Sequence, residues 1–101
     1  MKEAGLSFSQ TNDLVNIFRK YPEIKKTIIY GSRAKGNFNE RSDLDLVIIN
    51  SQISYQRLGD IIEDLNESDL PYTVDLQIFE DIKNKNLKDH ILRVGKTLYP
   101  I

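Results

Sequence analysis

Three aspartates in this sequence have the spacing of a carboxylate metal site. Asp43 and Asp45 are two residues apart at the start of an alternating apolar run, so on a β-strand both side chains would project from one face. Their Cα atoms would then be roughly 7 Å apart, and the side chains could converge on two ions about 3.5–4 Å apart. Asp75 interrupts a later apolar run, where its charge needs compensation. Oxygen ligands without His or Cys favour Mg²⁺, with Mn²⁺ as the alternative.

A glycine-containing basic turn precedes the aspartate pair and has features of a phosphate site. Gly31 lets the backbone approach an anion without a Cβ in the way, and Ser32 adds a short hydroxyl. The amides that follow would point at the anion if they begin a helical turn. Arg33 and Lys35 add positive charge, with the alternative that one of them faces solvent. The turn is not a P-loop, because Gly36 is followed by asparagine and not by lysine.

Each of these signals also has an ordinary structural explanation. An Asp-x-Asp pair is usually solvated surface, Asp43 alone could cap or end a strand, and Gly-Ser after a strand is most often only a turn. Asp75 could be an inward-pointing charge that protects a sheet edge. The order of the signals is more specific than its parts: a strand, Gly-Ser, a short basic turn, Asp-x-Asp opening the next strand, and a later strand-borne Asp.

The elements expected around these residues alternate between helix and strand. Apolar spacing predicts helices over residues 10–21, 55–67 and 87–94. Runs of β-branched or alternating residues predict strands over 26–30, 43–50 and 71–79. The expected helix signals are N-caps at Ser9 or Thr11, Ser54 and Asn86, and a stop at Gly95. This order predicts one α/β (α+β) domain over residues 1–101, a small mixed β-sheet with helices packed on one face, which would leave the other face for the site.

Composition narrows the class of protein. With 101 residues, 40% of them hydrophobic and 29% charged, the chain fits one globular domain. It has no cysteine, which excludes disulfides and thiolate metal sites and favours a cytoplasmic location. No apolar run is long enough to span a membrane, and residues 1–10 lack the layout of a signal peptide. A net charge of −1 gives no field that would attract nucleic acid, so direct nucleic-acid binding is not expected.

The stretch over residues 30–47, YGSRAKGNFNERSDLDLV, resembles the signature of the polymerase-β-like nucleotidyltransferase superfamily, and most closely its minimal nucleotidyltransferase branch. The resemblance implies that fold and a nucleotidyl transfer, with AMP from ATP favoured, to an acceptor hydroxyl. It implies that Asp43 and Asp45 hold two Mg²⁺ ions and that Asp75 completes the catalytic metal site. It places the triphosphate against Gly31, Ser32, Arg33 and Ser42.

The resemblance also implies a partner. Minimal members of this branch are often paired with a separate helical HEPN protein, and they act as antitoxins by adding AMP to it, by binding it, or both. The expected acceptor is therefore a hydroxyl on a HEPN-type partner or on a small molecule. The alternative function is a non-catalytic binding subunit that inhibits its partner by contact.

Overall fold

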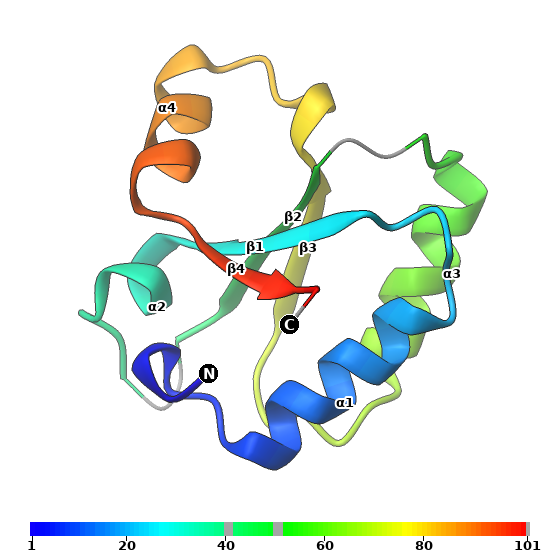
Figure 1. Cartoon of the computed structure of the whole chain (residues 1–101), viewed down its shortest axis with the longest axis horizontal. Helices are drawn as coiled ribbons and strands as arrows, with labels where there is room; N and C mark the ends of the chain where they lie inside the picture. The colour runs from blue at the N-terminus through cyan, green and yellow to red at the C-terminus, as the bar shows by residue number, and fades with distance from the viewer. Residues whose placement is uncertain (40–41, 50–51, 101) are drawn as a thin grey trace.

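A four-stranded mixed sheet with the strand order β3–β2–β1–β4 organises the fold (Figure 1). The computed structural model describes residues 1–39, 42–49 and 52–100. The strands are β1 (Lys26–Tyr30), β2 (Leu44–Ile49), β3 (Val74–Ile78) and β4 (Lys96–Tyr99). The helices are α1 (Phe8–Arg19), α2 (Gly31–Lys35), α3 (Tyr55–Asn66) and α4 (Lys85–Val94), with short 3₁₀ turns η1 (Lys2–Ala4) and η2 (Phe79–Asp81). β1 pairs antiparallel with β2 and β4, and β2 pairs parallel with β3.

The predicted helices and strands are all present, and their ends differ by a few residues. β1 has the predicted bounds, whereas β3 is shorter than the predicted 71–79. β2 occupies the predicted run from Leu44, and Asn50, its predicted last residue, lies outside the described residues. The connection at 32–36 is the short helix α2. Within the described ranges, no helix has the length and apolar character that a bilayer crossing requires.

Side-chain caps explain where the helices begin. Ser7 caps α1, because its Oγ accepts from the Gln10 amide at 3.1 Å while the Gln10 side chain accepts from the Ser7 amide at 3.0 Å. This capping box starts α1 before both predicted caps, Ser9 and Thr11, which are therefore wrong. Ser54 caps α3 as predicted. Asn84 caps α4 in place of the predicted Asn86.

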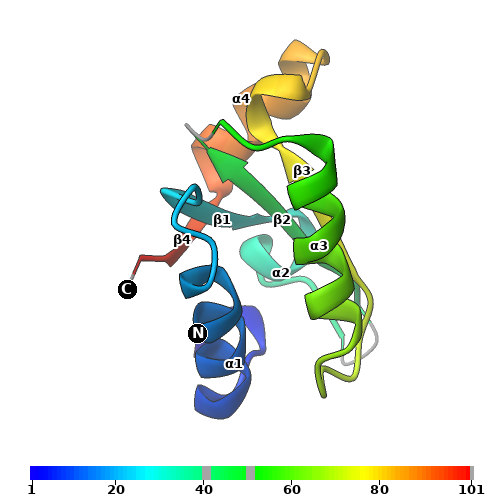
Figure 2. The ribbon, with the colours of Figure 1, turned by 90° about the vertical axis from the view of Figure 1, so that its right-hand side faces the viewer.

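The two faces of the sheet bury separate apolar clusters. α1 and α3 cover the face that carries Ile29 and Leu46. α4 lies on the opposite face of the sheet from α1 (Figure 2). There its Ile91 packs with Ile28 of β1 and Val47 of β2. α4 thus departs from the prediction that helices pack on one face only. The reason is that successive residues of β1 and β2 are apolar, so both faces of these inner strands need cover.

β4 is the strand that the sequence analysis missed. It follows α4 directly at Gly95 and pairs with β1 through Ile28–Thr97 and Ile29–Lys96. Leu98 is its buried side chain. Four residues at a sheet edge give too short a pattern to identify a strand, because the pairing partner is about 70 positions earlier in the chain.

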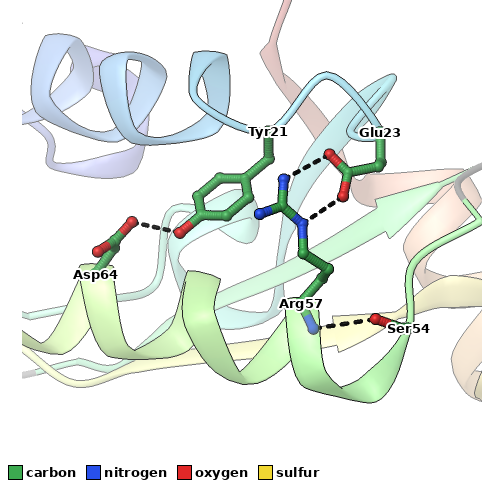
Figure 3. A network of polar contacts seen from close by, with 5 residues as sticks. All are labelled: Tyr21, Glu23, Ser54, Arg57 and Asp64. Atoms are coloured by element: carbon green, nitrogen blue, oxygen red, sulfur yellow. Dashed lines mark hydrogen bonds and ion pairs between the residues drawn. The ribbon is translucent and has the colours of Figure 1, made fainter.

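A polar network fastens α3 to the connection between α1 and β1 (Figure 3). Arg57 donates from Nε and Nη2 to the two carboxylate oxygens of Glu23, at 2.6 and 2.9 Å. Its guanidinium also lies 4.6 Å from the ring centroid of Tyr21, and the Tyr21 hydroxyl donates to Asp64 of α3. A bidentate Arg–carboxylate pair fixes geometry better than a single contact does. The network therefore fixes the position of α3 relative to the C-terminal end of α1 on their shared face of the sheet.

Loss of the Glu23 charge should destabilise the fold at neutral pH and lose its effect in acid. The hydrogen bonds from Arg57 lower the pKa of Glu23 from 4.5 to about 2. Because the folded pKa is depressed, this stability is complete above pH 4.5 and disappears as the pH falls through about 2. The difference in unfolding free energy between wild type and Glu23→Gln, measured in urea, should therefore shrink from pH 5 to pH 2. Glu63→Gln, on the exposed side of α3, is the matched control. A difference that stays constant with pH would show that the ion pair does not stabilise the fold.

Candidate active site

One row of side chains crosses three strands at the end of the sheet that leads into α2. The β1–β2 pairing places Tyr30 opposite Asp45, and the β2–β3 pairing places Asp45 opposite Asp75. Neighbouring strands are about 4.8 Å apart and cross-strand partners share a face, so these three side chains project from one face. It is the face that α4 covers further along, at Ile28 and Val47.

The carboxylates of Asp43, Asp45 and Asp75 lie within electrostatic reach of one another. Asp45 is half-buried, whereas Asp43 and Asp75 are exposed. Burial raises the pKa of the Asp45 carboxyl, and the charges of Asp75 and Asp43 raise it further. Like charges gathered in a partly desolvated position destabilise the ionised forms, and such arrangements are typical of functional sites. The structure thus brings together the three aspartates that the sequence singled out.

Gly31 holds the end of β1 directly against the Asp45 carboxylate. Its φ of +75° is in the left-handed region, and a Cβ added to it would lie 2.4 Å from Oδ2 of Asp45. Both the backbone conformation and the close approach therefore require glycine. Ser32 follows in α2 and is half-buried. The Gly-Ser turn and the aspartates are consequently neighbours in space, as the order of the motif implied.

Two further side chains, Gln77 and Tyr30, belong to this face, and the sequence analysis gave neither of them a functional role. Gln77 is two residues after Asp75, and its Nε2 donates to the Tyr30 hydroxyl at 3.1 Å. Burial, followed by the charges of Asp45 and Asp75, raises the pKa of Tyr30 to about 12. Tyr30 is therefore a neutral neighbour of the carboxylates near pH 7. The period of two along a strand already predicts that Gln77 shares the face of Asp75, whereas the position of Tyr30 required the strand register.

Arg33 and Ser42, two of the predicted triphosphate ligands, contact each other. Arg33 is only 1% exposed. Its Nε and Nη2 donate to the Ser42 carbonyl at 3.1 and 3.0 Å, and its Nη1 donates to the Ala4 carbonyl at 2.9 Å. The Ser42 hydroxyl accepts from the Asn39 amide at 2.9 Å. These bonds favour a role in fixing the loop, because a contact with phosphate would require Arg33 to leave its buried partners.

The donor set at this face suits a hard divalent cation. Within the described ranges, no three Asp, Glu, His or Cys side chains already form a metal cage. Mutual repulsion favours such an open arrangement, and two of the three carboxylates are on exposed side chains. An open cleft of about 430 Å³ borders Asp43, but its other lining residues, which include Asn66, Tyr72 and Thr73, belong to the end of α3 and the segment before β3, and neither Asp45 nor Asp75 lines it. A cation would relieve the repulsion that burial strengthens, so the residues present fit the predicted Mg²⁺ or Mn²⁺.

Comparison with known proteins identifies the family to which the chain belongs. The sequence profile of the polymerase beta nucleotidyltransferase family matches residues 12–100, which is most of the chain. No curated protein matches the chain.

Solved structures share the fold at low sequence identity. A toxin–antitoxin structure with AMP-PNP has a TM-score of 0.71 at 21% identity over 88% of this chain and 72% of that one. The toxin–antitoxin MntA–HepT has a TM-score of 0.63 at 19% identity over 88% of this chain and 68% of that one. A putative nucleotidyltransferase from Sulfolobus solfataricus has a TM-score of 0.52 at 14% identity over 86% of this chain and 73% of that one.

The substitution Gly31→Ala should disturb the site more than its backbone strain explains. Gly36→Ala is the matched control, because Gly36 also has a left-handed φ, +85°, while an added Cβ meets nothing within 4 Å. Gly36→Ala should cost about 1 kcal/mol of unfolding free energy from strain alone. Gly31→Ala should cost more, because its Cβ forces Asp45 to move, and should also weaken Mn²⁺ binding measured by the EPR signal of the free ion. Equal effects of the two substitutions would show that the Gly31–Asp45 contact is unimportant.

The substitution Asp45→Asn should stabilise the metal-free fold or leave it unchanged. A carboxyl whose folded pKa is raised destabilises the fold increasingly as the pH rises from the unfolded pKa through the folded one, so at pH 7 the full penalty is present and removal of the charge relieves it. The melting temperature of Asp45→Asn in EDTA at pH 7 should equal or exceed that of wild type, and the difference should fade below pH 4. Val47→Ala, on the same face, should instead melt at a lower temperature at every pH. A clear loss of metal-free stability in Asp45→Asn would indicate a structural role for Asp45.

Proposed function

This chain belongs to the polymerase beta nucleotidyltransferase family, and from that premise we propose that it is a metal-dependent nucleotidyltransferase that transfers AMP from ATP to an acceptor hydroxyl. The observation that carries the proposal is the row in which Asp45 lies beside Asp75 and against Gly31, with the Asp43 charge in reach. A half-buried carboxylate with two more negative charges beside it has no evident structural purpose, because the three charges destabilise the site that they form.

In the proposed reaction the acceptor oxygen forms a bond to the α-phosphorus of ATP, the bond to the β-phosphate oxygen breaks, and pyrophosphate leaves. The hydroxyl proton passes to a carboxylate or to solvent. Asp43 and Asp45 would hold Mg²⁺ or Mn²⁺, and Asp75 would complete the ligand set. When bound, the ions supply Lewis acidity to the acceptor hydroxyl and to the pyrophosphate leaving group.

The chain's own residues divide the remaining work. Gly31 and Ser32 would receive the triphosphate, because the Gly-Ser turn ends directly beside the Asp45 carboxylate, where a bound cation would face the phosphates. Asp75 lies on the edge strand and is exposed, so an acceptor reaches it from solvent. Tyr30 stays protonated and keeps water from one side of Asp45. These assignments make Asp43 and Asp45 essential for both binding and transfer, and Asp75 essential mainly for transfer.

We further propose that the acceptor is a hydroxyl group on a toxin partner, and we expect that partner to be a helical HEPN-type protein. Two of the similar structures are toxin–antitoxin complexes, and one of them holds the ATP analogue AMP-PNP. Transfer requires the acceptor oxygen within about 3–3.5 Å of the phosphorus and in line with the leaving group. A docked protein can hold a hydroxyl in that position, whereas a freely diffusing alcohol is not aligned. The proposed cellular role is that of an antitoxin in the cytoplasm.

A second candidate function is contact inhibition without chemistry. The toxin–antitoxin likeness favours it as much as it favours catalysis, because an antitoxin can neutralise a partner simply by covering it. The charge cluster favours catalysis, since a binding surface has no need of repelling carboxylates.

The test is to combine the purified chain with a candidate HEPN-type partner, sought among the products of the neighbouring genes, together with ATP and Mg²⁺, and to measure the intact mass of the partner. We expect the mass of one or more AMP groups on the partner, no addition with Asp43→Ala or Asp45→Ala, and at least a hundredfold slower addition with Asp75→Asn. Mg-ATP alone should raise the melting temperature of the chain, and at a hundredfold its Kd it should add about 2.7 kcal/mol of stability.

The contrary outcomes are distinct. If Asp43→Ala still neutralises the partner fully and wild type leaves its mass unchanged, contact inhibition is the function. If the isolated chain rapidly modifies a small molecule such as an aminoglycoside, the partner proposal fails. If millimolar Mg-ATP leaves the melting temperature of the folded chain unchanged, the metal–nucleotide site itself is wrong.

A further inference from the structure

Arg33 is a buried cation, and among the residues that the structure describes no carboxylate accepts a hydrogen bond from it. Its guanidinium is compensated by two backbone carbonyls and by two aromatic rings, with Phe38 at 5.1 Å and Tyr72 at 4.3 Å from Cζ to the ring centroids. Gly5 completes the enclosure, because a Cβ there would lie 2.8 Å from Nη1 of Arg33. Burial of a charge is costly unless its partners are well arranged, so this arrangement needs an explanation.

The contacts of Arg33 join the three segments that carry the candidate site. Arg33 itself belongs to α2, which begins at Gly31. The carbonyl that it holds in a two-pronged contact belongs to Ser42, the residue before Asp43. The ring on which it stacks belongs to Tyr72, three residues before Asp75. Beyond these contacts, the Leu44 amide donates to the Thr73 carbonyl at 2.9 Å, where the pairing of β2 with β3 begins.

We propose that Arg33 is a positioning residue that sets the relative placement of the Gly31 turn, the Asp43 segment and the Asp75 strand. The inference rests on the proposed function, since it is cation binding by these aspartates that the placement serves. This role requires the planar guanidinium, because two of its nitrogens donate to the Ser42 carbonyl while the group also stacks on the rings of Phe38 and Tyr72. Lysine keeps the charge but cannot supply two directed donors and a stacking plane at once.

The test compares Arg33→Lys with Arg19→Lys, the same substitution at an exposed position of α1. Two readouts are taken on variants whose circular dichroism shows the wild-type fold. The first is hydrogen exchange of the Leu44 amide against that of the Ile29 amide in the middle of the sheet. The second is the Kd for Mn²⁺ alone, from the EPR signal of the free ion. In Arg33→Lys we expect at least tenfold faster exchange at Leu44, unchanged exchange at Ile29 and at least tenfold weaker Mn²⁺ binding. Arg19→Lys should match wild type in all three.

Each other result is decisive. Wild-type Mn²⁺ affinity in Arg33→Lys overturns the inference, and if exchange at Leu44 is faster in that case the role of Arg33 is merely structural. Equal changes at Leu44 and Ile29 also overturn it, because they indicate general destabilisation. If wild type itself binds no Mn²⁺, the proposed function fails and the positioning role falls with it, while the exchange data still decide whether Arg33 orders the β2–β3 entry.

A second pair of variants covers the case in which Arg33→Lys does not fold. Tyr72→Phe keeps the ring under the guanidinium and loses only the hydroxyl contact with Gln10, whereas Tyr72→Leu removes the aromatic face. Tyr72→Leu should reproduce the loss of Mn²⁺ affinity by at least threefold, and Tyr72→Phe should retain it. Equal Mn²⁺ affinity in the two variants would overturn the role of the stacked guanidinium.

Discussion

The electrostatic repulsion among three carboxylates at one end of the sheet is the unfavourable interaction that the rest of the structure has to offset. Asp45 bears most of it, because it lies half-buried between Tyr30 of β1 and Asp75 of β3. Its position is maintained by the strand around it, in which Leu46, Val47 and Ile48 are fully buried. β2 is an inner strand with partners on both sides, and the two apolar clusters anchor it from opposite faces. The burial of the apolar residues of β2 thus offsets the unfavourable electrostatic energy of the Asp45 carboxylate and keeps it in place.

Local chemistry explains why much of this arrangement could be predicted from the sequence. The alternation in β2 and the spacing of apolar residues in α1 and α3 report which side chains face a core, and the structure confirms those elements. Gly31 and Asp45 were selected by residue type and order, and their contact follows from an antiparallel pairing of adjacent strands. The β1–β2 connection over residues 31–43 contains α2 and is long enough for either strand direction, so the antiparallel pairing itself was learned from the structure.

The features that the sequence analysis did not predict depend on contacts between segments far apart in the chain, and a local sequence pattern carries no information about such contacts. Arg33 was a candidate triphosphate ligand because its positive charge directly follows the Gly-Ser turn. The structure buries it, because Ser42 and Ala4 offer carbonyls while Phe38 and Tyr72 offer aromatic faces. β4 and the docking of α4 were missed or misplaced for the same reason. The helix stop at Gly95 was predicted from local rules, and the structure adds a tertiary reason: an added Cβ would lie 2.3 Å from the Ile91 carbonyl oxygen of the same helix and also 2.5 Å from Cγ2 of Ile28 on β1.

The close approach at Gly95 has a consequence for access to the site. It lets α4 lie directly on β1, so that Ile91 covers the same face of the sheet that carries Tyr30 and Asp45. This face is therefore divided between an apolar half under α4 and a charged half beyond it. On the β4 side the carboxylates are bounded by β1 and Tyr30, whereas on the opposite side β3 is an edge strand and Asp75 is exposed. In the proposed reaction, an acceptor carried by a folded partner would approach over the β3 edge. Because α4 covers one half of the face, only the half beside β3 is open to the acceptor in the proposed reaction.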